Sequence, residues 1–129
     1  MSWSYWCPHC EAGLNPDETV ILIGEHAGSR ILLGLHPQPG NYRAYLPPDV
    51  ELREGSRWVL YCPVCQKSLE TDVAEGLCAL DGLYQSQKHR VYFSPIVGEQ
   101  ATFVVTAEGL VEQFGRDADR HSLDLLNLV

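Results

Sequence analysis

The chain has 129 residues, of which 45% are hydrophobic and 20% are charged. That balance is typical of a folded single domain and excludes a disordered chain. The formal net charge is −8, from 17 acidic and 9 basic residues. Such a surface repels phosphate backbones and anionic membranes, so we expect neither nucleic acid nor a membrane as the partner.

The sequence predicts a cytoplasmic protein. No stretch approaches the roughly 18 apolar residues of a membrane-spanning helix. The N-terminal residues lack the basic and apolar regions of a secretory signal. The five cysteines, an odd number, do not fit a secreted disulfide framework.

Two C-P-x-C motifs dominate the chain, Cys7-Pro8-His9-Cys10 and Cys62-Pro63-Val64-Cys65. They belong to longer segments, 3–17 and 57–72, which share six identical residues when the first is shifted by 55 positions. The shared residues are Trp3/Trp58, Cys7/Cys62, Pro8/Pro63, Cys10/Cys65, Leu14/Leu69 and Asp17/Asp72. We interpret the two segments as copies of one local structure.

Two C-x-x-C pairs offer four thiolates, which is the number that a tetrahedral zinc site needs. We therefore predict one Zn²⁺ per chain, held by Cys7, Cys10, Cys62 and Cys65. A site with four protein thiolates leaves no position for water, so we expect a structural role and no catalytic residue. His9 lies inside the first motif and is expected beside the metal site. Leu14 and Leu69 are expected to cover it.

The segments 3–17 and 57–72 resemble the two knuckles of a zinc ribbon, the rubredoxin-like arrangement of paired C-x-x-C turns. The resemblance implies a zinc held by four cysteines, a small β-sheet around it, and roles that range from nucleic-acid binding to subunit contact. Rubredoxins, whose knuckles hold iron, usually have glycine after the second cysteine. Glu11 and Gln66 stand there in this chain, so an iron electron carrier is the less favoured alternative.

The first motif also resembles the C-P-H-C active site of DsbA-type thiol oxidoreductases. That resemblance implies a redox protein in which Cys7 and Cys10 react, with the first thiolate stabilised at a helix N-terminus. The segment 11–18 contains a glycine and a proline and is a poor helix, which counts against this alternative. The fifth cysteine, Cys78, is expected to be a buried, inert thiol.

The rest of the chain predicts a mostly β protein of antiparallel hairpins around the zinc ribbon. Residues 18–56 are expected to form a β insertion between the knuckles, and residues 73–115 a second β-rich part. Strands are expected where β-branched and aromatic residues gather, at 19–23, 31–35, 42–46, 57–61, 90–94, 101–106 and 109–114. Hairpin turns are expected within 24–30, at Asp81-Gly82 and at 107–109.

Residues 116–129 form a tail, which can include a short C-terminal helix. Its apolar residues could dock on the core or on a partner, as could the aromatic N-terminus if the core does not bury it. The candidate contact residues are Trp3, Tyr5, Trp6, Leu123, Leu126 and Val129. The sequence therefore predicts a non-enzymatic module that binds a protein or a second copy of itself. A β-barrel that binds a small molecule or nucleic acid is a further alternative.

Overall fold

The computed structural model describes residues 3–71 and 76–118. It contains nine β-strands in two antiparallel sheets, and the described residues form no α-helix. The prediction of a mostly β protein is thus confirmed. None of the described segments forms a helix of the length and apolarity that crossing a bilayer requires. The possible C-terminal helix, with Leu123, Leu126 and Val129, lies outside the described residues.

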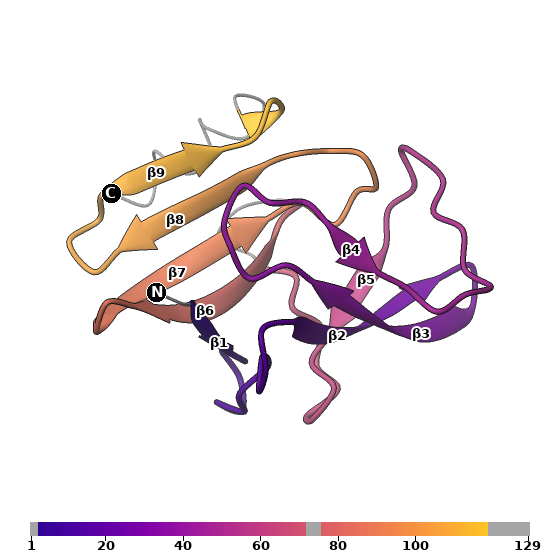
Figure 1. Cartoon of the computed structure of the whole chain (residues 1–129), viewed down its shortest axis with the longest axis horizontal. Coiled ribbons are helices and arrows are strands. Elements are labelled where there is room, and N and C mark those ends of the chain that lie inside the picture. The colour runs from indigo at the N-terminus through magenta and orange to yellow at the C-terminus, as the bar shows by residue number, and fades with distance from the viewer. Residues whose placement is uncertain (1–2, 72–75, 119–129) are drawn as a thin grey trace.

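The two sheets lie side by side (Figure 1). The strands that lead into the two knuckles lie where the sheets meet. The first sheet has the order β1–β6–β7–β8–β9, formed by Ser4–Trp6, Cys78–Tyr84, Gln87–Phe93, Thr102–Thr106 and Val111–Phe114. The second has the order β4–β3–β2–β5, formed by Ala44–Tyr45, Ser29–Leu35, Val20–His26 and Val59–Tyr61. The strands predicted at 101–106 and 109–114 are confirmed as β8 and β9, joined through Gly109 at φ 87°.

The two halves of the chain exchange their first strands. Strand β1 precedes the first knuckle but pairs with β6, which follows the second knuckle. In the same way, β5 precedes the second knuckle but pairs with β2, which follows the first. The registers agree, because Tyr5 faces Gly82 and its counterpart Leu60 faces Gly24. Each sheet is therefore completed by a strand from the other half.

The repeat extends well beyond the knuckles. The hairpins β2–β3 and β6–β7 each have two seven-residue strands and a two-residue turn. Both turn residues have positive φ, 52° and 83° at Ala27-Gly28 and 52° and 64° at Gln85-Ser86, as a type I′ turn requires. Strand β4 pairs with β3 as β8 pairs with β7. Each half is thus a strand, a knuckle, a hairpin and a further strand, and β9 is an addition to the second half.

The turn predicted at Asp81-Gly82 is wrong, because both residues lie inside β6 and the chain turns at Gln85-Ser86. Packing explains the glycine: a Cβ on Gly82 would lie 3.1 Å from Cζ3 of Trp3. Gly24 likewise lies inside β2, where a Cβ would meet Cε3 of Trp58 at 3.0 Å. Each glycine makes room for the tryptophan that directly precedes the exchanged strand.

The main core joins both sheets to the knuckles. It contains buried residues of the two hairpins, such as Leu22 and Leu80, together with Cys7 and Cys62. Trp3 and Tyr5 also belong to it, at 7% and 5% exposure. The core has therefore taken up these two aromatic residues, which leaves little of them for a partner.

Candidate metal centre

Each knuckle is a tight turn closed by its own backbone. Glu11 donates its N–H to the Cys7 carbonyl at 2.9 Å, and Gln66 donates to the Cys62 carbonyl at the same distance. Within each turn a backbone N–H points at the first sulfur, from His9 to Cys7 at 3.3 Å and from Val64 to Cys62 at 3.3 Å. N–H groups aimed at sulfur stabilise the thiolate form, which is the form that binds metal.

Glu11 and Gln66 adopt the left-handed conformation, with φ values of 63° and 61°. These are the positions at which rubredoxin-like knuckles usually carry glycine. In this chain the two non-glycine residues adopt the positive φ that glycine favours. A non-glycine residue costs roughly 1–2 kcal/mol there. The absence of glycine therefore does not prevent the knuckle from forming.

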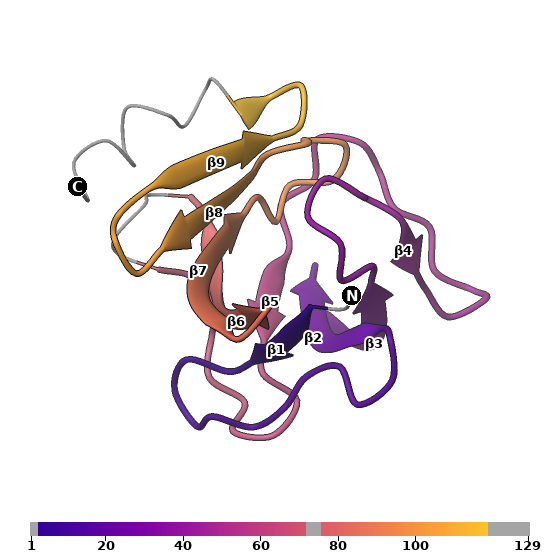
Figure 2. The ribbon, with the colours of Figure 1, turned by 60° about the vertical axis from the view of Figure 1, so that its left-hand side comes forward.

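The four cysteine sulfurs converge at the junction of the two halves, where the knuckles lie together at one end of the molecule (Figure 2). All four Sγ atoms lie within 4.8 Å of one another and could hold a metal ion. Two of the distances cross between the knuckles, 3.8 Å from Cys7 Sγ to Cys65 Sγ and 3.7 Å from Cys10 Sγ to Cys62 Sγ. A tetrahedron with metal–sulfur bonds of about 2.3 Å has edges of about 3.8 Å. The donor set therefore fits a tetrahedral metal.

The site has a buried side and an open side. Cys7 and Cys62 are fully buried, whereas Cys10 is exposed and Cys65 is partly exposed. Burial raises the pKa of the Cys7 thiol to about 12. Burial also raises the pKa of Cys62, but the N–H groups of Cys65 and Val64, together with the thiols of Cys10 and Cys7, outweigh it and bring that pKa down to about 7. Opposite shifts at equivalent positions are expected where close thiols share charge, because one thiolate disfavours the next.

Leu14 and Leu69 are buried in the core that adjoins the knuckles. Leu14 and Leu69 are each 1% exposed and belong to the same buried cluster as Cys7 and Cys62. Their N–H groups bond to the strands that lead into the knuckles, from Leu14 to the Tyr5 carbonyl at 2.9 Å and from Leu69 to the Leu60 carbonyl at 2.8 Å. These bonds fold the exit of each knuckle back on its entry.

The ring of His9 connects the two knuckles. Its Nε2 lies 3.1 Å from the carbonyl of Ser68, at the exit of the second knuckle. Cys78 lies outside the group of four sulfurs and is 1% exposed. Burial raises the pKa of its thiol to about 12, so it stays a protonated thiol at neutral pH.

The sequence did not reveal how far the repeat extends. The knuckles correspond at a shift of 55, but the hairpins correspond at 58, as the pairs Gly24/Gly82, Pro37/Pro95 and Gly40/Gly98 show. The turns after the hairpins have the same backbone bonds, from Asn41 to Gln38 at 3.0 Å and from Glu99 to Ile96 at 3.1 Å. An alignment of the two halves that allows a three-residue insertion after the knuckle would have revealed these pairs.

No family model matches the chain, and no curated protein or solved structure matches it either. The chemistry of the site therefore follows from this chain alone. Four convergent thiolates suit soft or borderline metals such as zinc and iron, and they do not suit magnesium or calcium.

Proposed function

We propose that the protein binds one zinc ion at Cys7, Cys10, Cys62 and Cys65 as a structural clamp, and that it acts as a non-enzymatic protein-interaction module. The convergence of the four sulfurs within 4.8 Å carries the metal part of this proposal. The clamp joins the two exchanged halves, because each close sulfur pair takes one cysteine from each knuckle.

A structural role fits the donor set better than catalysis. Four thiolates fill a tetrahedral zinc ion and leave no site for water or substrate. Structural zinc contributes on the order of 10 kcal/mol to folding, which is comparable to the whole stability of a small domain. Iron in the same knuckles is the alternative metal, since the backbone of both turns suits it equally.

Thiol redox chemistry at Cys7 and Cys10 is less well supported. A reactive first cysteine needs a lowered pKa and some exposure. Cys7 is instead fully buried, and burial raises its pKa. Its sulfur lies 3.8 Å from that of Cys65, which belongs to the other knuckle.

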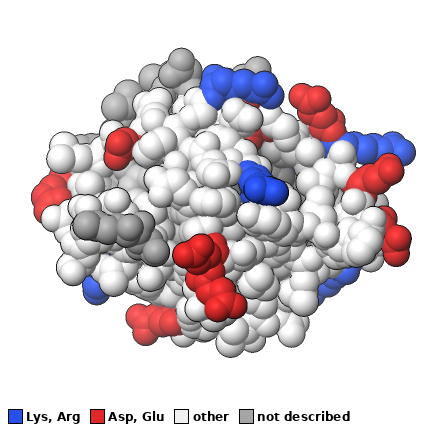
Figure 3. Space-filling model, in the orientation of Figure 1, with Lys and Arg blue, Asp and Glu red and all other residues white. Residues whose placement is uncertain are grey.

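The surface favours a protein as the partner. On the face in Figure 3, acidic and basic side chains are interspersed and form no basic stripe. With a net charge of −8, the chain lacks the electrostatic attraction that nucleic-acid binding requires. Trp6 is half-buried and Val64, at the tip of the second knuckle, is 64% exposed, which makes both available for contact.

Metal analysis of protein purified without chelator tests the clamp. We expect about one zinc per chain, a zinc–sulfur distance of about 2.3 Å by X-ray absorption, and four thiols that resist labelling. Cys65→Ser should lower the metal content, whereas the matched control Cys78→Val should not. Iron in place of zinc, or four freely reactive thiols and no metal, would overturn this part of the proposal.

The interaction role is tested separately, on the zinc-loaded chain. Sedimentation over a range of concentrations should reveal self-association, or a single monomer if the partner is another protein. Titration with fluorescent single-stranded and duplex oligonucleotides at low salt should show no binding. Oligonucleotide binding that weakens as salt rises would replace the protein partner with a nucleic acid.

A further inference from the structure

The two halves of the chain contact each other as the subunits of a two-fold dimer do. In such an interface the same surface is used twice, so that residue i contacts residue j and j contacts i. Here Tyr5 of the first half pairs with Gly82 of the second, and Leu60 of the second half pairs with Gly24 of the first. Each half therefore carries a complete surface for recognising the other.

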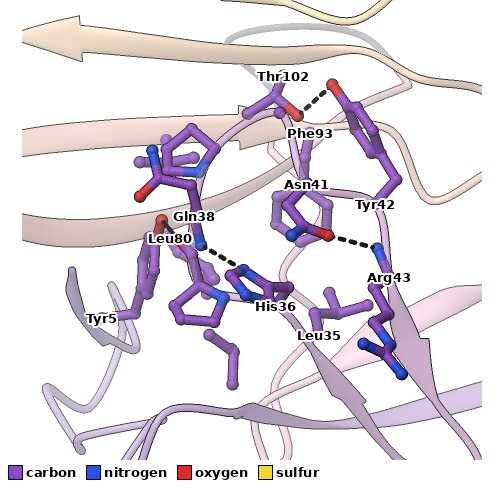
Figure 4. Close-up of a pocket in the computed structure, with 15 residues that line it drawn as sticks. Tyr5, Leu35, His36, Gln38, Asn41, Tyr42, Arg43, Leu80, Phe93 and Thr102 are labelled. Atoms are coloured by element: carbon purple, nitrogen blue, oxygen red, sulfur yellow. Dashed lines mark hydrogen bonds between the residues drawn. The ribbon is translucent and has the colours of Figure 1, made fainter. Parts of the chain in front are cut away.

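Contacts between the halves extend beyond the exchanged strands. The segment 36–43 of the first half and the residues Leu80 and Phe93 of the second line a common pocket (Figure 4). Across this boundary Thr102 donates its hydroxyl proton to the Tyr42 hydroxyl at 3.0 Å. The knuckles add the sulfur pairs at 3.7 and 3.8 Å. All these contacts form equally well when the two halves belong to different copies of the chain.

The segment 46–54, which we call the hinge, connects the two halves. None of its residues is buried. A backbone bond from the Val50 N–H to the Pro47 carbonyl, at 3.1 Å, closes a turn within it. The hinge ends where the chain is fixed to the second half, because Gly55 donates to the Val97 carbonyl at 2.8 Å. Opening the turn therefore redirects the chain without changing the strands of either half.

We propose that the chain forms a strand-exchanged dimer when metal is loaded at high protein concentration. The first half of each copy pairs with the second half of the other, and each hinge runs between the two units. Each metal is then held by Cys7 and Cys10 of one copy and by Cys62 and Cys65 of the partner copy. The inference rests on the proposed zinc clamp, and it makes a second copy of this chain the partner.

Protein concentration decides between the monomer and the dimer. A short linker holds the two parts that it joins at an effective concentration of about 1 mM, so a second copy competes only near that concentration. Opening the hinge also has a cost, because Val50 and Leu52 pack partly against the main core. The monomer is therefore expected in dilute solution. A metal-loaded dimer persists on dilution, because the copies separate only when the knuckles release the metal.

The native chain provides the first test. Its metal is removed with a chelator, and zinc is returned at about 1 mM protein and, in parallel, at about one hundredth of that concentration. Sedimentation and metal analysis should show a dimer in the first sample and a monomer in the second, each with about one zinc per chain. The dimer should survive dilution until a chelator is added. A dimer that dissociates on dilution with its zinc still bound would overturn the proposal.

Paired variants test whether the metal is shared between copies. One variant carries Cys7→Ser with Cys10→Ser, and the other carries Cys62→Ser with Cys65→Ser. Neither has four thiolates, but an exchanged dimer of the two has one complete site and one site without cysteine. The mixture, loaded at high concentration, should hold about one zinc per two chains in a dimer that contains both variants. A mixture that holds no more zinc than the separate variants would contradict the sharing of the metal.

The hinge offers a variant that changes no metal ligand. Removing residues 48–50 takes away the turn, so the chain can no longer fold back on its own second half and the effective concentration falls toward zero. This variant should form the dimer even when zinc is loaded in dilute solution. Glu51→Ala, an exposed change that keeps the hinge length, should behave as the native chain does.

Metal content separates the two proposals. A native chain that binds no zinc would refute the clamp and the exchange together. A native chain that binds zinc but stays monomeric at about 1 mM, or a zinc-loaded short-hinge variant that stays monomeric, would overturn the exchange and leave the clamp intact.

Discussion

Replacing Leu69 by alanine should destabilise the protein by about 3–4 kcal/mol. The change removes three buried carbons, which contribute roughly 0.8 kcal/mol each through burial, and leaves a cavity that adds to the loss. The site has little freedom to collapse. Leu69 is 1% exposed, and its backbone is held on both sides, to the Leu60 carbonyl at 2.8 Å and from the Ala79 N–H at 2.9 Å.

Leu14→Ala is the matched variant, because the repeat places it in the same setting. Leu14 is also 1% exposed, donates to the Tyr5 carbonyl at 2.9 Å and accepts from the Ile21 N–H at 2.8 Å. The two variants should therefore cost the same within about 1 kcal/mol. Leu110→Ala is the control, since Leu110 is 69% exposed and its loss should change stability by less than about 0.5 kcal/mol.

Denaturant unfolding of the metal-loaded chain measures these differences. Free metal must be buffered at one concentration for all variants, because binding to the folded state adds stability by mass action. Metal content should stay at the native level, since no ligand is changed. A cost below about 1 kcal/mol for Leu69→Ala would refute the view that the leucines are rigid parts of the metal-bearing core.

Four further changes should give clear results. Glu11→Gly and Gln66→Gly should each increase the free energy of unfolding by up to about 1 kcal/mol and so raise the melting temperature, because glycine adopts a positive φ without steric strain. A lower melting temperature would contradict this. Cys78→Val should keep its metal and cost less than about 2 kcal/mol, because Val20 holds the equivalent place in the first half; loss of metal would make Cys78 a ligand. Removing the metal with a chelator at neutral pH should collapse the amide dispersion of both knuckles in NMR spectra, and an unchanged spectrum would argue against a structural metal.

Local signals in the sequence were enough for the ligand group and for most strands. The C-P-x-C spacing sets the turn by itself, so it predicted which four sulfurs meet. The run 101–106 is β-branched and aromatic, and it became β8. Such patterns work because neighbouring residues determine the outcome.

The strand exchange could not be predicted, because it depends on contacts between distant segments. Asp81-Gly82 is a favoured turn dipeptide, yet Gly82 lies in a strand because Trp3 packs on it from the other half. The turn falls instead at Gln85-Ser86, which is a weak local signal. Tertiary packing has outweighed turn preference at this position.

The exchange also links the metal site to packing that does not touch it. The 51 residues between Cys10 and Cys62 form a loop whose closure costs about 4 kcal/mol of chain entropy. The pairing of β2 with β5 brings the second knuckle next to the first through backbone contacts that do not involve the sulfurs. Metal affinity should therefore depend on that pairing.

Gly24→Ala tests the link, because a Cβ there would lie 2.6 Å from Cδ2 of Leu33 and 3.0 Å from Cε3 of Trp58. Such overpacking costs roughly 1–3 kcal/mol, and it acts on the β2–β5 pair without touching a sulfur. Metal affinity can be measured by competition with a chromophoric chelator. It should fall about tenfold for each 1.4 kcal/mol by which the substitution weakens the β2–β5 pairing. Gly13→Ala has open space around it and should leave the affinity unchanged. Equal affinities for the two variants would mean that the knuckles find each other without the sheets.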